Sequence, residues 1–203
     1  LVDEPFKRIA IDLVGPLSPP SEEKHRYILS VIDVATRYPE AIPLKAIDTV
    51  TIAEELFKVF SRMGCPQEIL SDNGSQFTSG LMKEIFRLLS IKGVHTSPYH
   101  AQSNGVVERF HGTLKPMLKK VIQKQPKLWH RYLPALLFAC RELPNESTGY
   151  SPFELMFGRQ PRGPMELLAN TWTDHSVSQE EKSLCQYVFD LKNTITEACE
   201  IAQ

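Results

Sequence analysis

The stretch Ser71-Asp72-Asn73-Gly74 decides the fold class of this 203-residue chain. Asn-Gly is one of the commonest signals for a β-hairpin turn. Here, however, the stretch follows a short apolar strand predicted over 67–71 and precedes a helix predicted over 79–90, where apolar residues recur at helical spacing. A strand that leads into a helix predicts an α/β fold and places Asp72 at the end of a strand.

The segments on both sides extend this α/β pattern. Strands are predicted over residues 6–14, 27–34, 40–44, 67–71 and 94–96. Helices are predicted over residues 49–63, 79–90, 103–125 and 128–142, the first ending at Gly64. This order predicts a mixed five-stranded sheet flanked by helices, with the first strand next to the fourth. We expect one domain over 1–160, followed over 161–203 by a linker and an amphipathic helix (177–202) as a C-terminal helical extension.

Composition and charge narrow the classes of function. A net charge of -1 argues against binding nucleic acid by bulk charge alone. One segment, however, has seven basic residues and no acidic one: Arg109, Lys115, Lys119, Lys120, Lys124, Lys127 and Arg131. It is either a solvated helix face or a nucleic-acid contact. Prolines gather over 16–20 and 144–164, which are predicted to be loops.

Cysteine spacing and hydropathy give further expectations. Cys65, Cys140, Cys185 and Cys199 have no CxxC or Cys/His pairing at zinc-finger spacing, so no such zinc site is expected. Isolated cysteines suit a reducing compartment. No apolar run is long enough to cross a membrane. Because the chain starts at Leu, we expect it to be a fragment of a longer protein.

Three acidic residues, Asp12, Asp72 and Glu108, each have an ordinary explanation. Asp12 could be exposed on a strand, Asp72 could serve a turn, and Glu108 could stand in the first turn of a helix and favour its dipole. The 35 residues between Asp72 and Glu108 hold one helix, one strand and a loop, which returns the chain to the same side of the sheet. We therefore expect the three carboxylates to converge and to bind hard divalent cations.

At this point the chain resembles the integrases of retroviruses and gypsy-type LTR retrotransposons. The matching sequence motifs are Asp12-Leu-Val-Gly-Pro16, Asp33-Val-Ala-Thr-Arg-Tyr-Pro39, Ser71-Asp-Asn-Gly-Ser-Gln-Phe77, Tyr99-His-Ala-Gln-Ser-Asn-Gly-Val-Val-Glu-Arg-Phe-His111 and Thr148-Gly-Tyr-Ser-Pro-Phe-Glu-Leu-Met-Phe-Gly158. Their order and spacing extend to about residue 164. The last motif, Thr148 to Gly158, makes the resemblance strongest to the gypsy-type branch.

The resemblance implies a ribonuclease-H-like fold and a DDE catalytic site of Asp12, Asp72 and Glu108. It implies two Mg²⁺ ions, replaceable by Mn²⁺, and no organic cofactor. The reaction would be phosphoryl transfer on double-stranded DNA: 3′-end processing of element DNA, then strand transfer into target DNA. The expected enzyme acts as a homo-oligomer in the nucleus, with a cytoplasmic phase and no membrane association.

Further residues take expected roles from the same resemblance. Tyr99, Gln102, Ser103 and Asn104 resemble the family's flexible active-site loop and are expected to contact DNA. His111 and Lys115 share a helix face with Glu108, and Lys119 lies in the same basic segment; we expect all three to contact DNA, the alternative being a solvated helix surface. Ala101 departs from the family's usual Pro. We expect this stretch of sequence to lack the family's zinc-binding and C-terminal domains.

Two other classes of function are left open. The first is a host-domesticated derivative that binds DNA or protein without catalysis. The second is a related DDE transposase or ribonuclease-H-like nuclease, which would share the metal site and differ in substrate.

Overall fold

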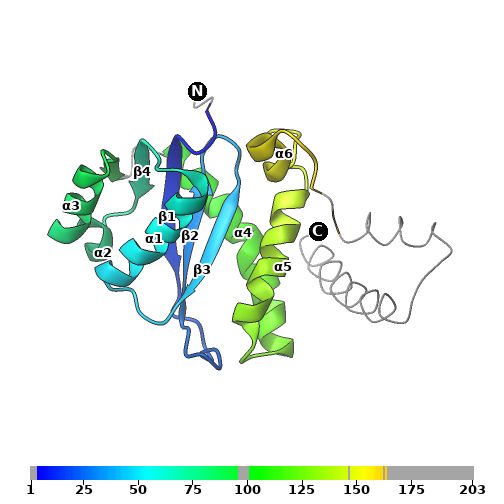
Figure 1. Cartoon of the computed structure of the whole chain (residues 1–203). Helices are drawn as coiled ribbons and strands as arrows, with labels where there is room; N and C mark the ends of the chain where they lie inside the picture. The colour runs from blue at the N-terminus through cyan, green and yellow to red at the C-terminus, as the bar shows by residue number, and fades with distance from the viewer. Residues whose placement is uncertain (1–3, 96–100, 146, 162, 164–203) are drawn as a thin grey trace, which may run out of the picture.

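A mixed sheet of five strands forms the centre of the computed structural model, which describes residues 4–95, 101–145, 147–161 and 163 (Figure 1). The strands are β1 (Arg8–Val14), β2 (Tyr27–Asp33), β3 (Pro39–Leu44), β4 (Glu68–Ser71) and β5 (Lys92–His95). Their order is β3-β2-β1-β4-β5. The β1–β2 and β2–β3 pairs are antiparallel, and the β1–β4 and β4–β5 pairs are parallel. The predicted five-stranded mixed sheet, with β1 next to β4, is confirmed.

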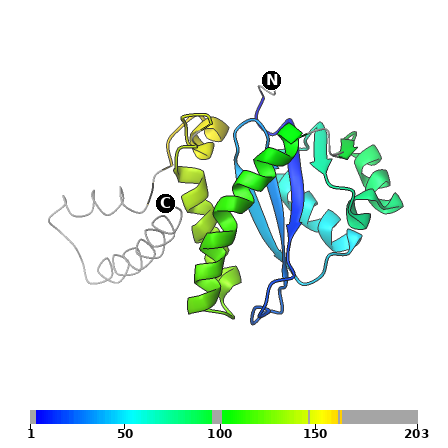
Figure 2. The same cartoon turned by 180° about the vertical axis from the view of Figure 1, so that it is seen from behind.

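Helices cover both faces of this sheet. They are α1 (Thr49–Met63), α2 (Ser75–Thr78), α3 (Gly80–Leu88), α4 (Ala101–Lys124), α5 (Trp129–Glu142) and α6 (Pro152–Phe157). Figure 1 shows α1 in front of the sheet, and Figure 2 shows α4 crossing the opposite face with α5 beside it. None of the helices in the described part of the chain is both long and apolar enough to span a membrane.

The alternation of side chains along β1 divides the core into two sides. Ile9 and Ile11 are buried in one apolar cluster with residues of α1 and α3. Ala10 and Val14 are buried in two others, with residues of α4 and α5. Because Asp12 lies between Ala10 and Val14 in this alternation, the fold directs its side chain toward α4.

Asp33 at the end of β2 is completely buried and holds a tight turn. Its Oδ1 accepts the Phe6 N–H at 3.1 Å, and its Oδ2 accepts the N–H and the hydroxyl of Thr36 at 2.9 and 2.6 Å. Arg37 in the same turn has a left-handed backbone, with φ at 65°. The motif from Asp33 to Pro39 therefore has a structural role, because the Asp33 carboxylate fixes the β2–β3 connection.

Several predicted boundaries need correction. The long helix begins at Ala101 rather than at Ser103 or Asn104. The short helix α2 directly after Asp72 was not predicted, and α6 lies in the proline-rich segment expected to be a loop. In α6, Ser151 accepts a hydrogen bond from the Glu154 N–H and Pro152 occupies the first turn, so local capping overrides the proline signal. The predicted helix over 177–202 lies outside the described residues.

Candidate active site

Asp12 stands on the central strand, half-buried beneath α4. Its Oδ1 accepts the Leu13 N–H at 2.7 Å, and its Oδ2 lies 3.5 Å from Nδ1 of His111 on α4. Burial raises the pKa of Asp12, and the nearby charge of Asp72 raises it further, whereas the Leu13 N–H and the Lys115 ammonium lower it. The carboxylates of Asp12 and Asp72, on two neighbouring parallel strands, are thus close enough to interact electrostatically.

Asp72 is exposed at the end of β4, where the chain turns into α2. Its Oδ1 accepts the Gly74 N–H at 2.9 Å. A Cβ atom on Gly74 would clash with Nε2 of Gln76 and lie 2.9 Å from this same Oδ1, so a larger residue here would displace these side chains. The Asn-Gly pair therefore shapes a strand-to-helix turn around Asp72, and the β-hairpin alternative is excluded.

Glu108 lies on α4 and is exposed to solvent. The first turn of α4 contains no acidic residue, because the helix begins at Ala101, so the helix-dipole explanation for Glu108 does not apply. The structure describes all three predicted site residues, Asp12, Asp72 and Glu108. Their carboxylate oxygens do not all lie within 4.8 Å of one another. Their assignment as catalytic and metal-binding residues stays a prediction.

His111 is buried and joins α4 to β1 and β2. The Ser30 hydroxyl donates to the carbonyl oxygen of Asp12 at 3.0 Å, and it lies 2.9 Å from Nε2 of His111. Since the hydroxyl has one hydrogen and gives it to Asp12, Nε2 of His111 must donate to Ser30. Burial, and then the charge of Lys115, lower the pKa of His111 from its ordinary value of 6.5 to about 4. The ring is therefore neutral at pH 7, and Nδ1 carries a lone pair.

The lone pair on Nδ1 of His111 bears on whether the residues around Asp12 suit a divalent cation. Nδ1 of His111 and Oδ2 of Asp12 are then two acceptors only 3.5 Å apart, an arrangement that needs a cation or a donated hydrogen between or beside them. Carboxylate oxygens are the ligands that Mg²⁺ prefers. By ligand chemistry the carboxylates of Asp12, Asp72 and Glu108, with His111 beside Asp12, suit such an ion, although the three do not meet as a group in this structure.

Ser30 is the residue of this site that sequence reasoning missed. It is fully buried and faces α4 from the middle of β2. One signal could have found it: Ser30 is the single polar residue in the otherwise apolar run from Ile28 to Ile32. A hydroxyl in such a run needs a hydrogen-bond partner within the fold.

The residues predicted to contact DNA differ in their exposure to solvent and in the part of the structure where they lie. Lys115 and Lys119 are exposed on α4, and Lys115 is close enough to affect the pKa of both Asp12 and His111. His111 is buried rather than on a solvated surface, so its contact with DNA stays a prediction that the burial does not favour. Gln102, Ser103 and Asn104 lie in the first turn of α4, not in a loop, which corrects that expectation. Tyr99 lies outside the described residues.

The family match decides the identity of this fold. Residues 2–101 match the family described as Integrase core domain. The chain belongs to the integrase core domain family. The matched range contains Asp12 and Asp72, and Glu108 follows it on α4.

Relatives of this integrase core domain are found among retroviruses, retrotransposons and animal genomes. It is 36% identical over 170 residues to Uncharacterized protein K02A2.6 of Caenorhabditis elegans. It is 32% identical over 185 residues to the Pro-Pol polyprotein of simian foamy virus type 3 (strain LK3), and 30% identical over 164 residues to Gypsy retrotransposon integrase-like protein 1 of Rattus norvegicus. These alignments cover 83%, 91% and 79% of this chain but only 13%, 16% and 31% of the relatives.

Solved integrases share the fold of this integrase core domain. A chain of the simian T-cell lymphotropic virus intasome, solved in complex with PP2A regulatory subunit B56 gamma, superposes with a TM-score of 0.65 at 22% identity over 78% of this chain and 56% of that one. The HTLV-2 integrase catalytic core domain in complex with magnesium gives a TM-score of 0.60 at 19% identity, over 75% of this chain and 97% of that one. The predicted ribonuclease-H-like fold is confirmed.

Proposed function

We propose that this integrase core domain is the catalytic core of a DNA integrase, a DDE polynucleotidyl transferase that processes the 3′ ends of element DNA and transfers them into target DNA. One observation carries the proposal: the Asp12 carboxylate lies close enough to Asp72 for the two charges to interact, and it contacts His111. His111 follows Glu108 by one turn of α4. The membership of the integrase core domain family supports it.

The residues around Asp12 have distinct proposed roles. Asp12, Asp72 and Glu108 would hold two Mg²⁺ ions, for which Mn²⁺ could substitute. When bound, such a pair activates the attacking oxygen of water or of a DNA 3′-hydroxyl and stabilises the leaving oxygen. The Ser30 hydroxyl would tie His111 to the Asp12 backbone, and Nδ1 of His111 would face a bound ion beside the Asp12 carboxylate. Lys115 and Lys119 would neutralise DNA phosphates beside the carboxylates.

The partners follow from the reaction. Integration joins two DNA ends to one target, so we propose that the domain acts as a homo-oligomer on double-stranded DNA. The solved relatives include an intasome and a trimeric form of a catalytic core, which supports an assembly. We propose the nucleus as the place of action, after a cytoplasmic phase, because that is where target chromosomal DNA lies.

A branched DNA that mimics the strand-transfer product tests this proposal. Such a substrate does not require knowledge of the whole element end, and its cleavage and rejoining are measured with Mg²⁺ or Mn²⁺ by gel electrophoresis of a labelled strand. Asp12→Asn, Asp72→Asn and Glu108→Gln should each abolish the reaction. Glu54→Gln, an exposed acid on α1 across the sheet, is the matched control and should leave it unchanged.

Calorimetric titration with Mn²⁺ separates the integrase from the rival without catalysis. We expect Mn²⁺ binding by the wild-type chain and the Glu54→Gln control, and its loss in Asp72→Asn. If Asp72→Asn binds Mn²⁺ as tightly as wild type, the proposed metal site is wrong. A chain that binds the branched DNA but neither binds Mn²⁺ nor cleaves would instead be a domesticated binding module.

A further inference from the structure

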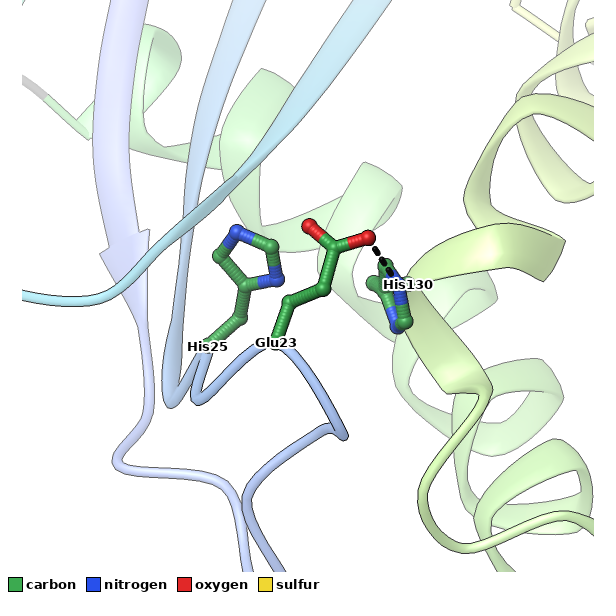
Figure 3. A group of neighbouring side chains, drawn as sticks. All are labelled: Glu23, His25 and His130. Atoms are coloured by element: carbon green, nitrogen blue, oxygen red, sulfur yellow. Dashed lines mark hydrogen bonds and ion pairs between the residues drawn. The ribbon is translucent and has the colours of Figure 1, made fainter.

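A second group of potential metal ligands lies outside the acidic site. Glu23 and His25 belong to the connection between β1 and β2, and His130 lies in the first turn of α5. Each offers one ligand atom, and these three atoms all lie within 4.8 Å of one another. Figure 3 shows the carboxylate of Glu23 between the two imidazole rings. Among the described residues this is the one group of three His, Cys, Asp or Glu side chains with such spacing.

The two rings are packed inside the protein, whereas the carboxylate reaches solvent. His25 is 9% exposed and the His130 side chain is 7% exposed, compared with 57% for the Glu23 side chain. The ring centroids of His25 and His130 lie 5.3 Å apart, and Trp129 packs against both rings. A metal ion held here would have one wet side, on which water could complete its coordination.

Hydrogen bonding leaves the His25 ring able to act as a ligand. Nδ1 of His25 lies 3.1 Å from the hydroxyl of Ser21, which can accept its proton and leave Nε2 with a free lone pair. This is the usual arrangement of a metal-binding histidine, in which the second nitrogen is held by a hydrogen bond. Nε2 of His130 lies 3.2 Å from Oε1 of Glu23, so the ring nitrogen and the carboxylate already face each other.

The backbone around the group is held together by contacts that do not involve the three side chains. The Glu22 N–H donates to the carbonyl oxygen of Lys127 at 2.8 Å, and the Glu22 carboxylate pairs with Arg131. Within the β1–β2 connection, the Ser21 N–H donates to the carbonyl oxygen of His25 at 3.0 Å, and Lys24 between them has a left-handed backbone with φ at 68°. The two segments that carry the ligands are therefore positioned in advance, as a metal site requires.

We propose that Glu23, His25 and His130 bind a divalent transition-metal ion, Zn²⁺, which fastens the β1–β2 connection to the start of α5. Two imidazoles and one carboxylate, with a fourth position for water, form a known zinc ligand set. Mg²⁺ prefers oxygen ligands, so the site discriminates against the ion expected at Asp12, Asp72 and Glu108. The cysteine spacing gave no sign of this site, because its ligands are two histidines that lie 105 positions apart in the sequence and one acid.

Zinc titration of the full chain tests the proposal. An untagged, chelator-treated chain is titrated with Zn²⁺ by calorimetry in the presence of excess Mg²⁺, and again in an Asp72→Asn background, so that the acidic site does not contribute. We expect one Zn²⁺ per chain and an increase in the thermal unfolding midpoint on binding. His130→Gln and Glu23→Gln should each weaken binding by about tenfold or more. His95→Gln removes an imidazole on β5 outside the group and is the matched control.

The outcomes separate the proposal from chance binding. Replacement of Zn²⁺ by Co²⁺ should give visible absorption bands in wild type and His95→Gln that disappear in Glu23→Gln. If Glu23→Gln binds Zn²⁺ with the stoichiometry and affinity of wild type, the ion is held elsewhere and the proposal fails. Glu23 is exposed on a loop, so this variant stays folded even where a change at buried His130 disturbs the core. Zinc binding in the Asp72→Asn background would stand whether or not the chain is an integrase.

Discussion

Nδ1 of His111 on α4 lies 3.5 Å from Oδ2 of Asp12 on β1, and Ser30 on β2 binds both residues. This three-residue connection fixes the depth and rotation of α4 relative to the centre of the sheet. It also decides which side of α4 carries Glu108 toward solvent. The proposed catalytic geometry therefore depends on a buried hydrogen-bond chain as well as on the three carboxylates.

A double-mutant cycle should reveal this connection. Ser30→Ala removes the acceptor of the His111 Nε2–H and one donor to Asp12, so we expect a loss of about 1–3 kcal/mol in the free energy of unfolding. His111→Ala should cost a similar amount or more, because it also leaves a cavity. The double variant should lose less than the sum, with a coupling energy of about 0.5–3 kcal/mol in urea unfolding. Additive losses would contradict a direct bond between the two side chains.

Stability should fall with acid because of His111. In the unfolded chain this residue takes up a proton below its ordinary pKa of 6.5, whereas in the folded chain it does so only near its lowered pKa of about 4. Between these values the unfolded state binds more protons, so the contribution to the free energy of unfolding is complete above pH 6.5 and is lost toward pH 4. The raised pKa of Asp12 acts in the opposite direction.

His111→Gln isolates the histidine from the other titrating groups. Urea unfolding of wild type and of this variant is measured at a series of pH values across that window, and the difference between the two proteins is plotted. We expect the wild-type advantage to shrink as the pH falls. An advantage that stays constant with pH would show that His111 titrates normally in the folded chain.

Asp33→Asn should weaken the fold and leave metal binding intact. The change converts one oxygen, which accepts hydrogen bonds from Phe6 or Thr36, into a donor inside a fully buried turn. We expect a loss of about 2–3 kcal/mol in the free energy of unfolding, the cost of breaking a hydrogen bond to a buried charge. Mn²⁺ affinity of the folded variant should equal that of wild type. A large drop in Mn²⁺ affinity at conditions where the variant is folded would assign Asp33 to the metal site instead.

Lys115→Ala and Lys119→Ala should each weaken DNA binding mainly at low salt. Both side chains are exposed on α4, and each phosphate contact contributes about one unit to the slope of log K against log salt concentration. Fluorescence anisotropy with a labelled duplex at several salt concentrations gives this slope. Lys83→Ala, an exposed lysine on α3 across the sheet, is the control and should leave the slope unchanged. Equal slopes for all three variants would remove Lys115 and Lys119 from the DNA surface.

Elements with a clear hydrophobic period were predicted well from the sequence. Helix α1 has the predicted bounds, Thr49 to Met63, because its apolar residues recur at helical spacing and Asp48 and Gly64 cap its ends. The start of α4 at Ala101 was not predicted, since the Ser-Asn-Gly run over residues 103–105 has low helix propensity. Helix α2 has only four residues, too few for a period to be read.

By itself, the sequence determined the order of the strands and of the four longer helices, the α/β class and the candidate acids, because these depend on local periodicity and on short motifs. Only the tertiary structure decided how distant residues meet. Burial makes His111 a neutral partner of Asp12 and Ser30 rather than a surface residue, and it brings His130 beside Glu23 and His25. Such contacts depend on strand register and helix placement, and a one-residue change in either would turn these side chains to another face.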